Sequence, residues 1–239
     1  MEGYYTPYVP GFDTHGLPTE RKAIEVLGLD RDKVGVNKFR NTCKDFALGF
    51  VEKQSEGFKR LGVLGDWKDP YITLRPEFES RQIGVFGDMY KKGYIYKGSR
   101  IINWCPKCKT SLSDAEVEHE DQDGHFWHIK YPIAGTDRFL EIATTRPETL
   151  LGDTAIAVHP DDERYKDIVG KMAILPLVNR EIPIVADYYV DKEFGTGAVK
   201  ITPAHDPNDF EVGKRHNLPE INIMNDDATI NEKGGKYAG

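Results

Sequence analysis

The segment ATTRPETLLGDTAIAVHP, at residues 143–160, gathers side chains that could bind a small polar ligand. It carries hydroxyls and a guanidinium on the turn that follows a predicted strand. These residues are Thr144, Thr145, Arg146 and Thr149. Alone, the segment is better explained by an ordinary turn with a helix cap than by a binding site.

A second segment, GTGAVKITPAHDPNDFEVG at residues 195–213, follows Phe194 and adds cationic, hydroxyl and acidic groups: Lys200, Thr202, Asp206 and Asp209. Its two N-terminal glycines predict a loop whose backbone approaches another group closely. The two aspartates are three residues apart, so they share one face if a helix begins near residue 208. Such an acidic pair suits an ammonium group and a hydroxyl. Both segments together, in this order and about 50 residues apart, favour a binding site over a structural capping pattern.

The segment YVPGFDTHGLPTE, at residues 8–20, predicts a strand that enters a helix through a turn. In an open α/β sheet, ligands bind beyond the carboxyl ends of the strands. Asp13 would present an anion there, suited to the ammonium of a free amino acid, with His15 beside it. The alternative is that both residues only cap the following helix.

Cys105 and Cys108 have the C-x-x-C spacing of a zinc knuckle. A tetrahedral site needs four ligands, and no second such pair is present in the sequence. The pair is therefore a half-site or two turn cysteines. His119, His125 or His128 could complete the ligand set only as a weaker alternative.

The first half of the sequence predicts three helices. The first begins at Pro18 and stops at Gly28, and the second has Asn37 as N-cap and ends before Gly62. The third covers residues 76–92 and is expected to bury its apolar residues, Phe78, Phe86 and Met89.

The second half predicts short strands in six runs: FWHIKY, FLEIATT, TAIAVH, MAILPLV, EIPIVA and GAVKIT. Short helices are expected at 161–168 and 208–216, and the acidic stretch HEDQDG at 119–124 is the predicted junction. The spacing favours a compact, β-barrel-like domain. The expected fold class is α/β, with a helix-rich domain over 1–118 and a second domain over 119–239.

Bulk composition excludes several classes. The 239 residues include no apolar run long enough to span a bilayer and no secretory signal pattern. The three cysteines suit a reducing cytoplasm, so a cytoplasmic protein without membrane association is expected. The formal net charge of −7 argues against a generally basic surface, although a local basic patch could still bind RNA.

The two segments at 143–160 and 195–213 resemble the editing motifs of valyl-type class I aminoacyl-tRNA synthetases, a family of the Val/Ile/Leu group. TTRPET is the valyl form, whereas isoleucyl enzymes carry a TTTPWT-like version and leucyl enzymes carry AHDxRDFE in the second motif. PGFDTHGLPTE is similar to the segment after the HIGH signature, and its wording is closer to the isoleucyl type. The resemblance implies a partial Rossmann-like core with the cysteine knuckle, then an editing (connective polypeptide) domain truncated at its C-terminus.

The resemblance also implies residue roles. Asp13 would hold the amino group of the substrate amino acid at the synthetic site. The editing pocket would be lined by Arg146, Thr149, Phe194, Lys200, Thr202, Asp206 and Asp209. In that pocket Asp209 would hold the amino group, and Asp206 or Thr149 would lie near the threonine hydroxyl of Thr-tRNA(Val).

The chain contains no serine or cysteine after Ser113. An acyl-enzyme route through those nucleophiles is therefore excluded in this region, and hydrolysis would use a positioned water. A hydrophobic pocket rejects threonine in favour of valine by only about 10²-fold, a limit for which the valyl enzyme is itself the standard example. A second, hydroxyl-reading site meets that need.

The ATP- and Mg-dependent synthetic reaction, with tRNA(Val), valine and ATP as partners, is expected of the parent enzyme. HIGH and KMSKS elements are absent from the chain and would lie before and after it. Charging by this chain alone is therefore not expected, and its first 100 residues should expose apolar surface. The alternatives are an isoleucyl-type fragment, a freestanding trans-editing deacylase, or a non-catalytic RNA-binding remnant.

Overall fold

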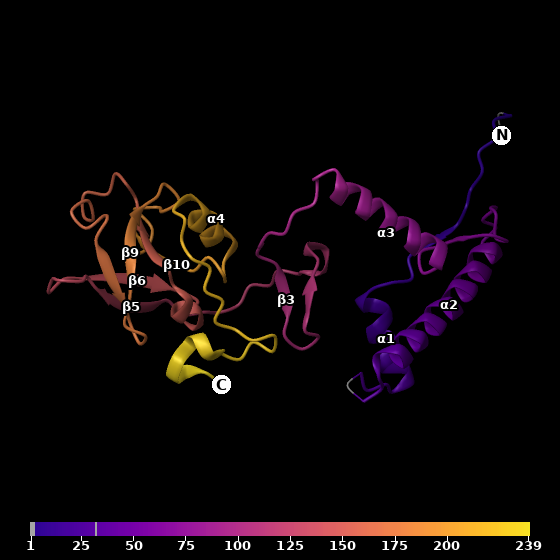
Figure 1. The fold of residues 1–239 in the computed structure, drawn as a ribbon, viewed down its shortest axis with the longest axis horizontal. Helices are drawn as coiled ribbons and strands as arrows, with labels where there is room; N and C mark the ends of the chain where they lie inside the picture. The colour runs from indigo at the N-terminus through magenta and orange to yellow at the C-terminus, as the bar shows by residue number, and fades with distance from the viewer. Residues whose placement is uncertain (1–2, 32) are drawn as a thin grey trace. The chain divides into compact units, whose positions relative to one another are not determined.

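The computed structural model describes residues 3–31 and 33–239. The chain divides into two compact units, Met1–Gly98 and Ser99–Gly239, which are considered separately (Figure 1). The stretch 119–124, expected as the junction, has no regular secondary structure and lies within the second unit. Within the second unit the Trp104 Nε1–H donates to the Asp226 carbonyl at 2.8 Å, a bond between residues far apart in the sequence.

The first unit is built around a short parallel strand pair, β1 (Gly11–Phe12) and β2 (Tyr71–Ile72). Three helices accompany it, α1 (Leu17–Leu27), α2 (Val36–Arg60) and α3 (Pro76–Lys91). A small core joins the strands to α2, and its buried residues are Phe12, Ala47, Val51, Ile72 and Leu74. Beyond the two strands a further hydrogen bond joins the same segments, from the Thr14 backbone N–H to the Thr73 side-chain Oγ1 at 3.0 Å.

The predicted helices are present with nearly the predicted ends. Gly28 closes α1 in the left-handed conformation, with its N–H bonded to the Ile24 carbonyl, and Pro76 opens α3. Asn37 was expected to cap α2, but the helix begins at Val36 with Gly35 as N-cap, so Asn37 lies inside the first turn.

The apolar side of α3 is exposed, contrary to the expected burial. Phe86 and Met89 are 59% and 43% exposed, and Phe78 is only half-buried against Tyr71. No residue of α3 is buried. The first unit therefore exposes apolar surface, as expected for part of a parallel sheet that lacks its other strands.

The second unit opens with a hairpin of β3 (Asn103–Cys105) and β4 (Thr110–Leu112), followed by the short 3₁₀ helix η1 (Asp114–Glu116). All six predicted strand runs are strands. They are β5 (Trp127–Pro132), β6 (Phe139–Thr144), β7 (Ala155–Val158), β8 (Met172–Leu175), β9 (Arg180–Ala186) and β10 (Ala198–Ile201).

Four of these strands form a sheet in the order β10-β7-β9-β8, in which only the β7–β9 pair is parallel. β5 and β6 form an antiparallel hairpin. That hairpin adjoins both sheet edges, because β6 lies beside β10 and an isolated bridge joins Ile133 to Ala173 of β8. The strands enclose a core whose largest fully buried members include Tyr131, Ile142 and Ile184.

One α-helix, α4 (Pro207–Arg215), and two 3₁₀ segments, η2 (Pro147–Gly152) and η3 (Glu232–Tyr237), complete the described part of this unit. The helix expected at 161–168 is wrong. That segment is a series of turns in which N–H groups bond three residues back, as from Tyr165 to Asp162 and from Ile168 to Tyr165. The Asp162 carboxylate stabilises this alternative by accepting the Arg164 N–H at 3.0 Å.

The structure is thus of mixed α/β content. In the part of the chain that is described, no helix is both long and apolar enough to cross a bilayer.

Gly152 allows a close approach that no other residue would. An added Cβ would lie 2.9 Å from the Ile221 carbonyl oxygen and 3.2 Å from the Thr202 methyl. We expect Gly152→Ala to destabilise the second unit by about 2 kcal/mol, because the carbonyl cannot move without shifting its segment. Chemical denaturation would measure this. Gly124→Ala is the control, since its Cβ would meet nothing within 4 Å; equal unfolding midpoints for the two variants would refute the close-contact argument.

Candidate functional site

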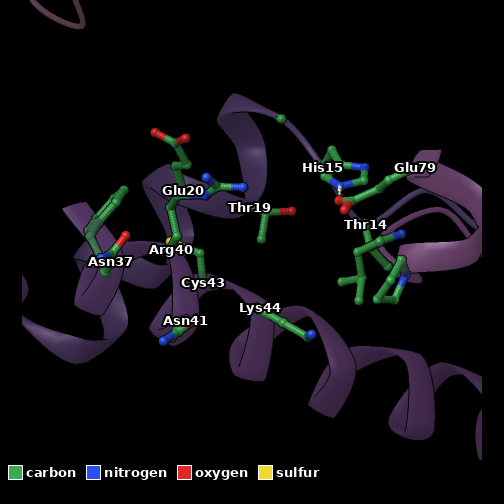
Figure 2. Close-up of a pocket in the computed structure, with 14 residues that line it drawn as sticks. Thr14, His15, Thr19, Glu20, Asn37, Arg40, Asn41, Cys43, Lys44 and Glu79 are labelled. Atoms are coloured by element: carbon green, nitrogen blue, oxygen red, sulfur yellow. Dashed lines mark hydrogen bonds and ion pairs between the residues drawn. The ribbon is translucent and has the colours of Figure 1, made fainter. Parts of the chain in front are cut away.

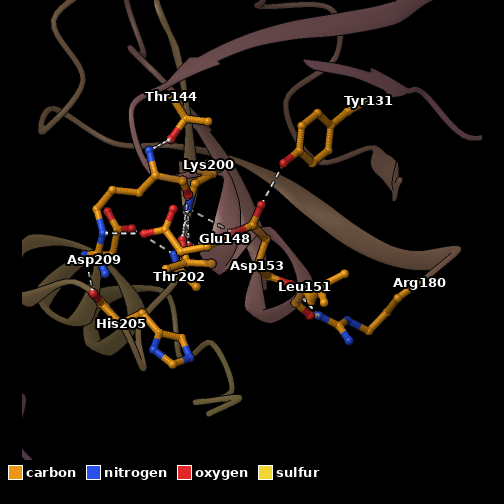
Figure 3. Close-up of polar contacts among 12 residues, drawn as sticks. Tyr131, Thr144, Glu148, Leu151, Asp153, Arg180, Lys200, Thr202, His205 and Asp209 are labelled. Atoms are coloured by element: carbon orange, nitrogen blue, oxygen red, sulfur yellow. Dashed lines mark hydrogen bonds and ion pairs between the residues drawn. The ribbon is translucent and has the colours of Figure 1, made fainter. Parts of the chain in front are cut away.

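The two chemically rich segments predicted from sequence meet in the second unit. Register explains this, because β10 pairs antiparallel with β7 and places Lys200 opposite Ile156. The pairing extends past the strands, where the Thr154 N–H donates to the Ile201 carbonyl at 2.9 Å. As a result, η2 and the loop between β10 and α4 emerge side by side (Figure 3).

Lys200 lies at the centre of a buried polar network. Its Nζ donates to Thr149 Oγ1 and Thr202 Oγ1, both at 2.7 Å, and lies 3.3 Å from Asp153 Oδ1. The Lys200 and Asp153 side chains are 8% and 0% exposed. The ammonium thus finds three oxygen acceptors, which a buried cation requires.

Asp153 is the main residue that sequence reasoning missed. Its carboxylate accepts from Thr202 Oγ1 at 2.6 Å and from the Tyr131 hydroxyl at 2.7 Å, in addition to Lys200. Burial raises the pKa of Asp153, while Lys200 and the two hydroxyls oppose that rise. The sequence did contain a signal for Asp153, because this carboxylate directly precedes TAIAVH, and every residue of β7 in that run is buried. Tyr131 is fully buried, and no sequence pattern marked it as part of the site.

Asp206 and Asp209 lie at the start of α4, as the three-residue spacing predicted. Asp206 is the N-cap, and its Oδ1 accepts from the Asn208 and Asp209 N–H groups at 2.8 and 3.1 Å. Asp209 is buried, and its Oδ2 accepts the Thr202 N–H at 2.9 Å. Burial raises the pKa of Asp209 to about 6, the Thr202 N–H opposes this, and the Asp206 charge adds to it.

Arg146 bridges the two segments from the surface. Its Nη1 donates to the His205 carbonyl at 2.8 Å, and its Nε donates to Glu148 at 3.1 Å. Thr144 supports it by accepting the Arg146 N–H at 3.1 Å, and the Thr149 hydroxyl donates to the Arg146 carbonyl at 3.1 Å. One hydrogen-bond network therefore joins seven predicted residues of the two segments: Thr144, Arg146, Thr149, Lys200, Thr202, Asp206 and Asp209.

Two other predicted residues lie outside this network. Thr145 is exposed. Phe194 is 66% exposed and contacts Phe126, with ring centroids 6.2 Å apart. No hydrogen bond or ring contact of the described residues joins either one to Lys200 or Asp209.

Asp13 and His15 belong to the first unit. Asp13 is exposed and its Oδ1 accepts the His15 N–H at 3.3 Å, whereas Gly16 is the cap of α1. His15 Nε2 lies 3.2 Å from Glu79 Oε1 at a cleft of about 500 Å³ (Figure 2). Asp13 instead lines a smaller neighbouring cleft of about 230 Å³. The two residues therefore face different hollows.

Cys105 and Cys108 lie at the tip of the β3–β4 hairpin, where the Cys108 N–H donates to Cys105 Sγ at 3.4 Å. Among the described residues, no group of three or more histidine, cysteine or acidic side chains could hold a metal ion. The residues present do not fit a complete zinc site, and the histidines considered as substitutes do not complete one.

The C-terminal end of α4 is held by an ionic cluster. Asp187 accepts from Arg215 Nε at 3.0 Å, from His216 Nε2 at 2.8 Å and from the Tyr189 N–H at 2.9 Å. Burial alone would raise the pKa of Asp187, but these donors outweigh it and hold the pKa at about 2. This cluster fixes the helix that carries Asp209.

Comparison with known proteins gives the class. The family model described as tRNA synthetases class I (I, L, M and V) matches residues 1–217. The chain therefore belongs to the class I tRNA synthetases of this group.

Individual relatives indicate the amino-acid type within this class. The chain is 54% identical to the Valine--tRNA ligase of Clostridium perfringens and 50% identical to that of Thermotoga maritima. Both alignments cover all of this chain and 28% of the relative, so the chain spans just over a quarter of their length. Among solved structures, the ternary complex of Agrobacterium radiobacter K84 agnB2 LeuRS, tRNA and LeuAMS matches with a TM-score of 0.38 and 21% identity, covering 92% of this chain and 36% of that one.

Asp153→Asn should destabilise the second unit strongly. The amide would place an N–H group among three donors and leave the Lys200 ammonium without its anion. We expect a loss of about 3 kcal/mol, typical of breaking a buried pair, measured by urea unfolding. Asp167→Asn is the matched control, because Asp167 and its partner Arg138 are both about half exposed. A midpoint shift no larger than that of the control would contradict the central role of Asp153.

Acid should weaken the Asp187 cluster within a defined pH window. The folded-state pKa of about 2 lies below the ordinary value of 3.8, so ionised Asp187 stabilises the fold above pH 3.8 and loses this effect as pH falls to about 2. Asp187→Asn should cost about 1–2 kcal/mol at neutral pH, reduced because Arg215 is half exposed, and little at pH 2. Unfolding measured at both pH values tests this. A cost that stays the same at pH 2 would show that the effect is not electrostatic.

Proposed function

We propose that the chain is part of a valine--tRNA ligase. The names of the relatives at 50–54% identity support the amino acid. In this proposal the first unit contributes to a Rossmann-like core that handles valine, ATP and Mg. The second unit is a β-barrel-like editing domain that meets tRNA(Val) in the cytoplasm. The order β8-β5-β6-β10 at the sheet edges supports the barrel-like description.

The second unit is proposed to hydrolyse the ester bond of Thr-tRNA(Val). The observation that carries this proposal is the Asp209 carboxylate, which is 6% exposed and held by one backbone N–H. In the described part of the chain no hydrogen bond reaches its Oδ1, so that oxygen can accept from a ligand ammonium. A buried anion with an open acceptor binds a cation strongly because little water competes.

The threonine hydroxyl needs a partner that valine would leave unpaired. Thr149 Oγ1 already donates to the Arg146 carbonyl and accepts from Lys200. Asp206 uses Oδ1 for the helix cap, and Oδ2 has no bond within the described residues. Of the two candidates, Asp206 is therefore favoured as the acceptor for the threonine hydroxyl.

Water is the proposed nucleophile, because residues 114–239 contain neither serine nor cysteine. Backbone N–H groups at η2 and the vicinal hydroxyl of the terminal ribose would stabilise the developing oxyanion. Lys200, with Thr149 and Thr202, is proposed to hold the floor of the pocket. Asp13 is proposed to bind the amino group of free valine, and Phe194 to contact the ligand from the exposed rim.

Asp209→Ala tests the editing proposal. We expect Thr-tRNA(Val) deacylation by the 239-residue chain to fall by at least about 100-fold, because a desolvated charge pair contributes roughly 3 kcal/mol. In the unaltered chain kcat/KM, corrected for spontaneous hydrolysis, should rise with pH through about 6 as Asp209 ionises. Radiolabelled Thr-tRNA(Val) provides the assay.

Glu211→Gln is the control, since Glu211 lies on the same helix with an exposed side chain that pairs with Lys214. Unchanged deacylation in Asp209→Ala would refute the amino-group role. Hydrolysis of valine from tRNA(Ile) in preference to threonine from tRNA(Val) would instead favour the isoleucyl-type alternative. Release of threonine with no requirement for ATP would be expected of this domain and of a freestanding deacylase alike.

A further inference from the structure

His205 joins three segments of the second unit through three different atoms. Its N–H donates to the Thr202 carbonyl at 2.9 Å, and its own carbonyl accepts from Arg146 Nη1 at 2.8 Å. Its ring Nε2 accepts the Ile223 N–H at 3.1 Å. Figure 3 shows the His205 ring turned away from the Lys200 network.

The partner of the ring fixes its tautomer. A backbone N–H can only donate, so Nε2 must carry a lone pair and the neutral imidazole holds its proton on Nδ1. An imidazolium would place an N–H group against the Ile223 N–H and break the bond. Burial lowers the pKa of His205, Arg146 and Lys200 lower it further, and Glu148 opposes them. The neighbouring charges therefore favour the neutral form.

The segment held by the ring is packed tightly. Ile223 is fully buried in the core, and the Ile221 carbonyl lies close to Gly152. The His205 ring itself lies against Gly152, where an added Cβ would be 3.3 Å from its Cδ2. The ring thus spans the space between η2 and residues 221–223.

The next residue is Asp206, the cap of α4. The His205 carbonyl therefore positions Arg146. The same peptide also positions the N-cap of the helix that carries Asp209. If the ring released Ile223, the bonds that the described residues still give His205 would be those to the Thr202 carbonyl and to Arg146, which is exposed.

We propose that His205, as the neutral Nδ1–H tautomer, is a positioning residue that holds Arg146 and the Asp206–Asp209 pair in register by anchoring their loop to Ile223. The catalytic consequence rests on the proposed editing function, whereas the tautomer and the anchor do not.

The anchor is tested by NMR on the 239-residue chain. The ¹⁵N shifts should show an unprotonated Nε2, and the Ile223 amide should be protected from hydrogen exchange near pH 7.5. Its protection factor, corrected for the intrinsic rate, should fall once the pH drops below the His205 pKa. A protonated Nε2 at pH 7.5 would overturn the proposal.

Two variants separate the hydrogen bond from the bulk of the ring. His205→Gln retains an acceptor at every pH and should keep the Ile223 protection without its acid-side loss. His205→Phe fills the space without an acceptor and should lower the protection about 10-fold, near the net contribution of one hydrogen bond. Equal protection in the Phe variant and the unaltered chain would overturn the anchor.

Activity gives an independent readout. For Thr-tRNA(Val) deacylation at pH 7.5, the Phe variant should lower kcat at least 10-fold with less change in KM, and the Gln variant should restore most of it. Full activity in the Phe variant would overturn the positioning role. If the unaltered chain hydrolyses no Thr-tRNA(Val) while the NMR results are as expected, the editing function and its catalytic consequence fail, and the anchor stands.

Discussion

The second unit depends on the burial of one positive charge, the ammonium of Lys200, against the carboxylate of Asp153. Removing both charges from water is costly, and attraction offsets that cost only when the remaining donors and acceptors are satisfied. The hydroxyls of Thr149, Thr202 and Tyr131 provide this satisfaction. Because these hydroxyls come from η2, from the loop that follows β10 and from β5, the charge pair constrains how three separate segments meet.

Helix α4 shows how one short element can carry opposite electrostatic environments. At its start, Asp209 is buried beside a second carboxylate, and its pKa is raised to about 6. At its end, Asp187 is surrounded by donors from Arg215, His216 and Tyr189, and its pKa is about 2. Asp187 therefore stays ionised and anchors the helix at any ordinary pH, whereas Asp209 changes its charge near pH 6.

Much of this arrangement could be predicted from the sequence, because it depends on signals between residues close together in the chain. All six strand runs and the helix ends at Gly28 and Pro76 follow from alternation and from glycine and proline signals. The three-residue spacing placed Asp206 and Asp209 together on α4. What failed depended on tertiary contacts. The side chain of Asp162 stabilises turns where a helix was expected, by accepting the Arg164 N–H. The roles of Asp153 and Tyr131 could not be predicted, because their hydrogen bonds form only when β5, β7 and β10 pack together.

Strand β7 is buried along its whole length, and its residues alternate between small and large. Ala155 and Ala157 belong to the cluster that includes Val212 of α4, while Ile156 and Val158 fill the main core. The two methyl groups thus act as a spacer that sets how near the helix can come to the sheet. Larger side chains at these two positions would move α4 away from the sheet. The loop before α4 would then have to stretch or lose its hydrogen bonds. The position of the polar site is therefore set in part by two uncharged methyl side chains, those of Ala155 and Ala157.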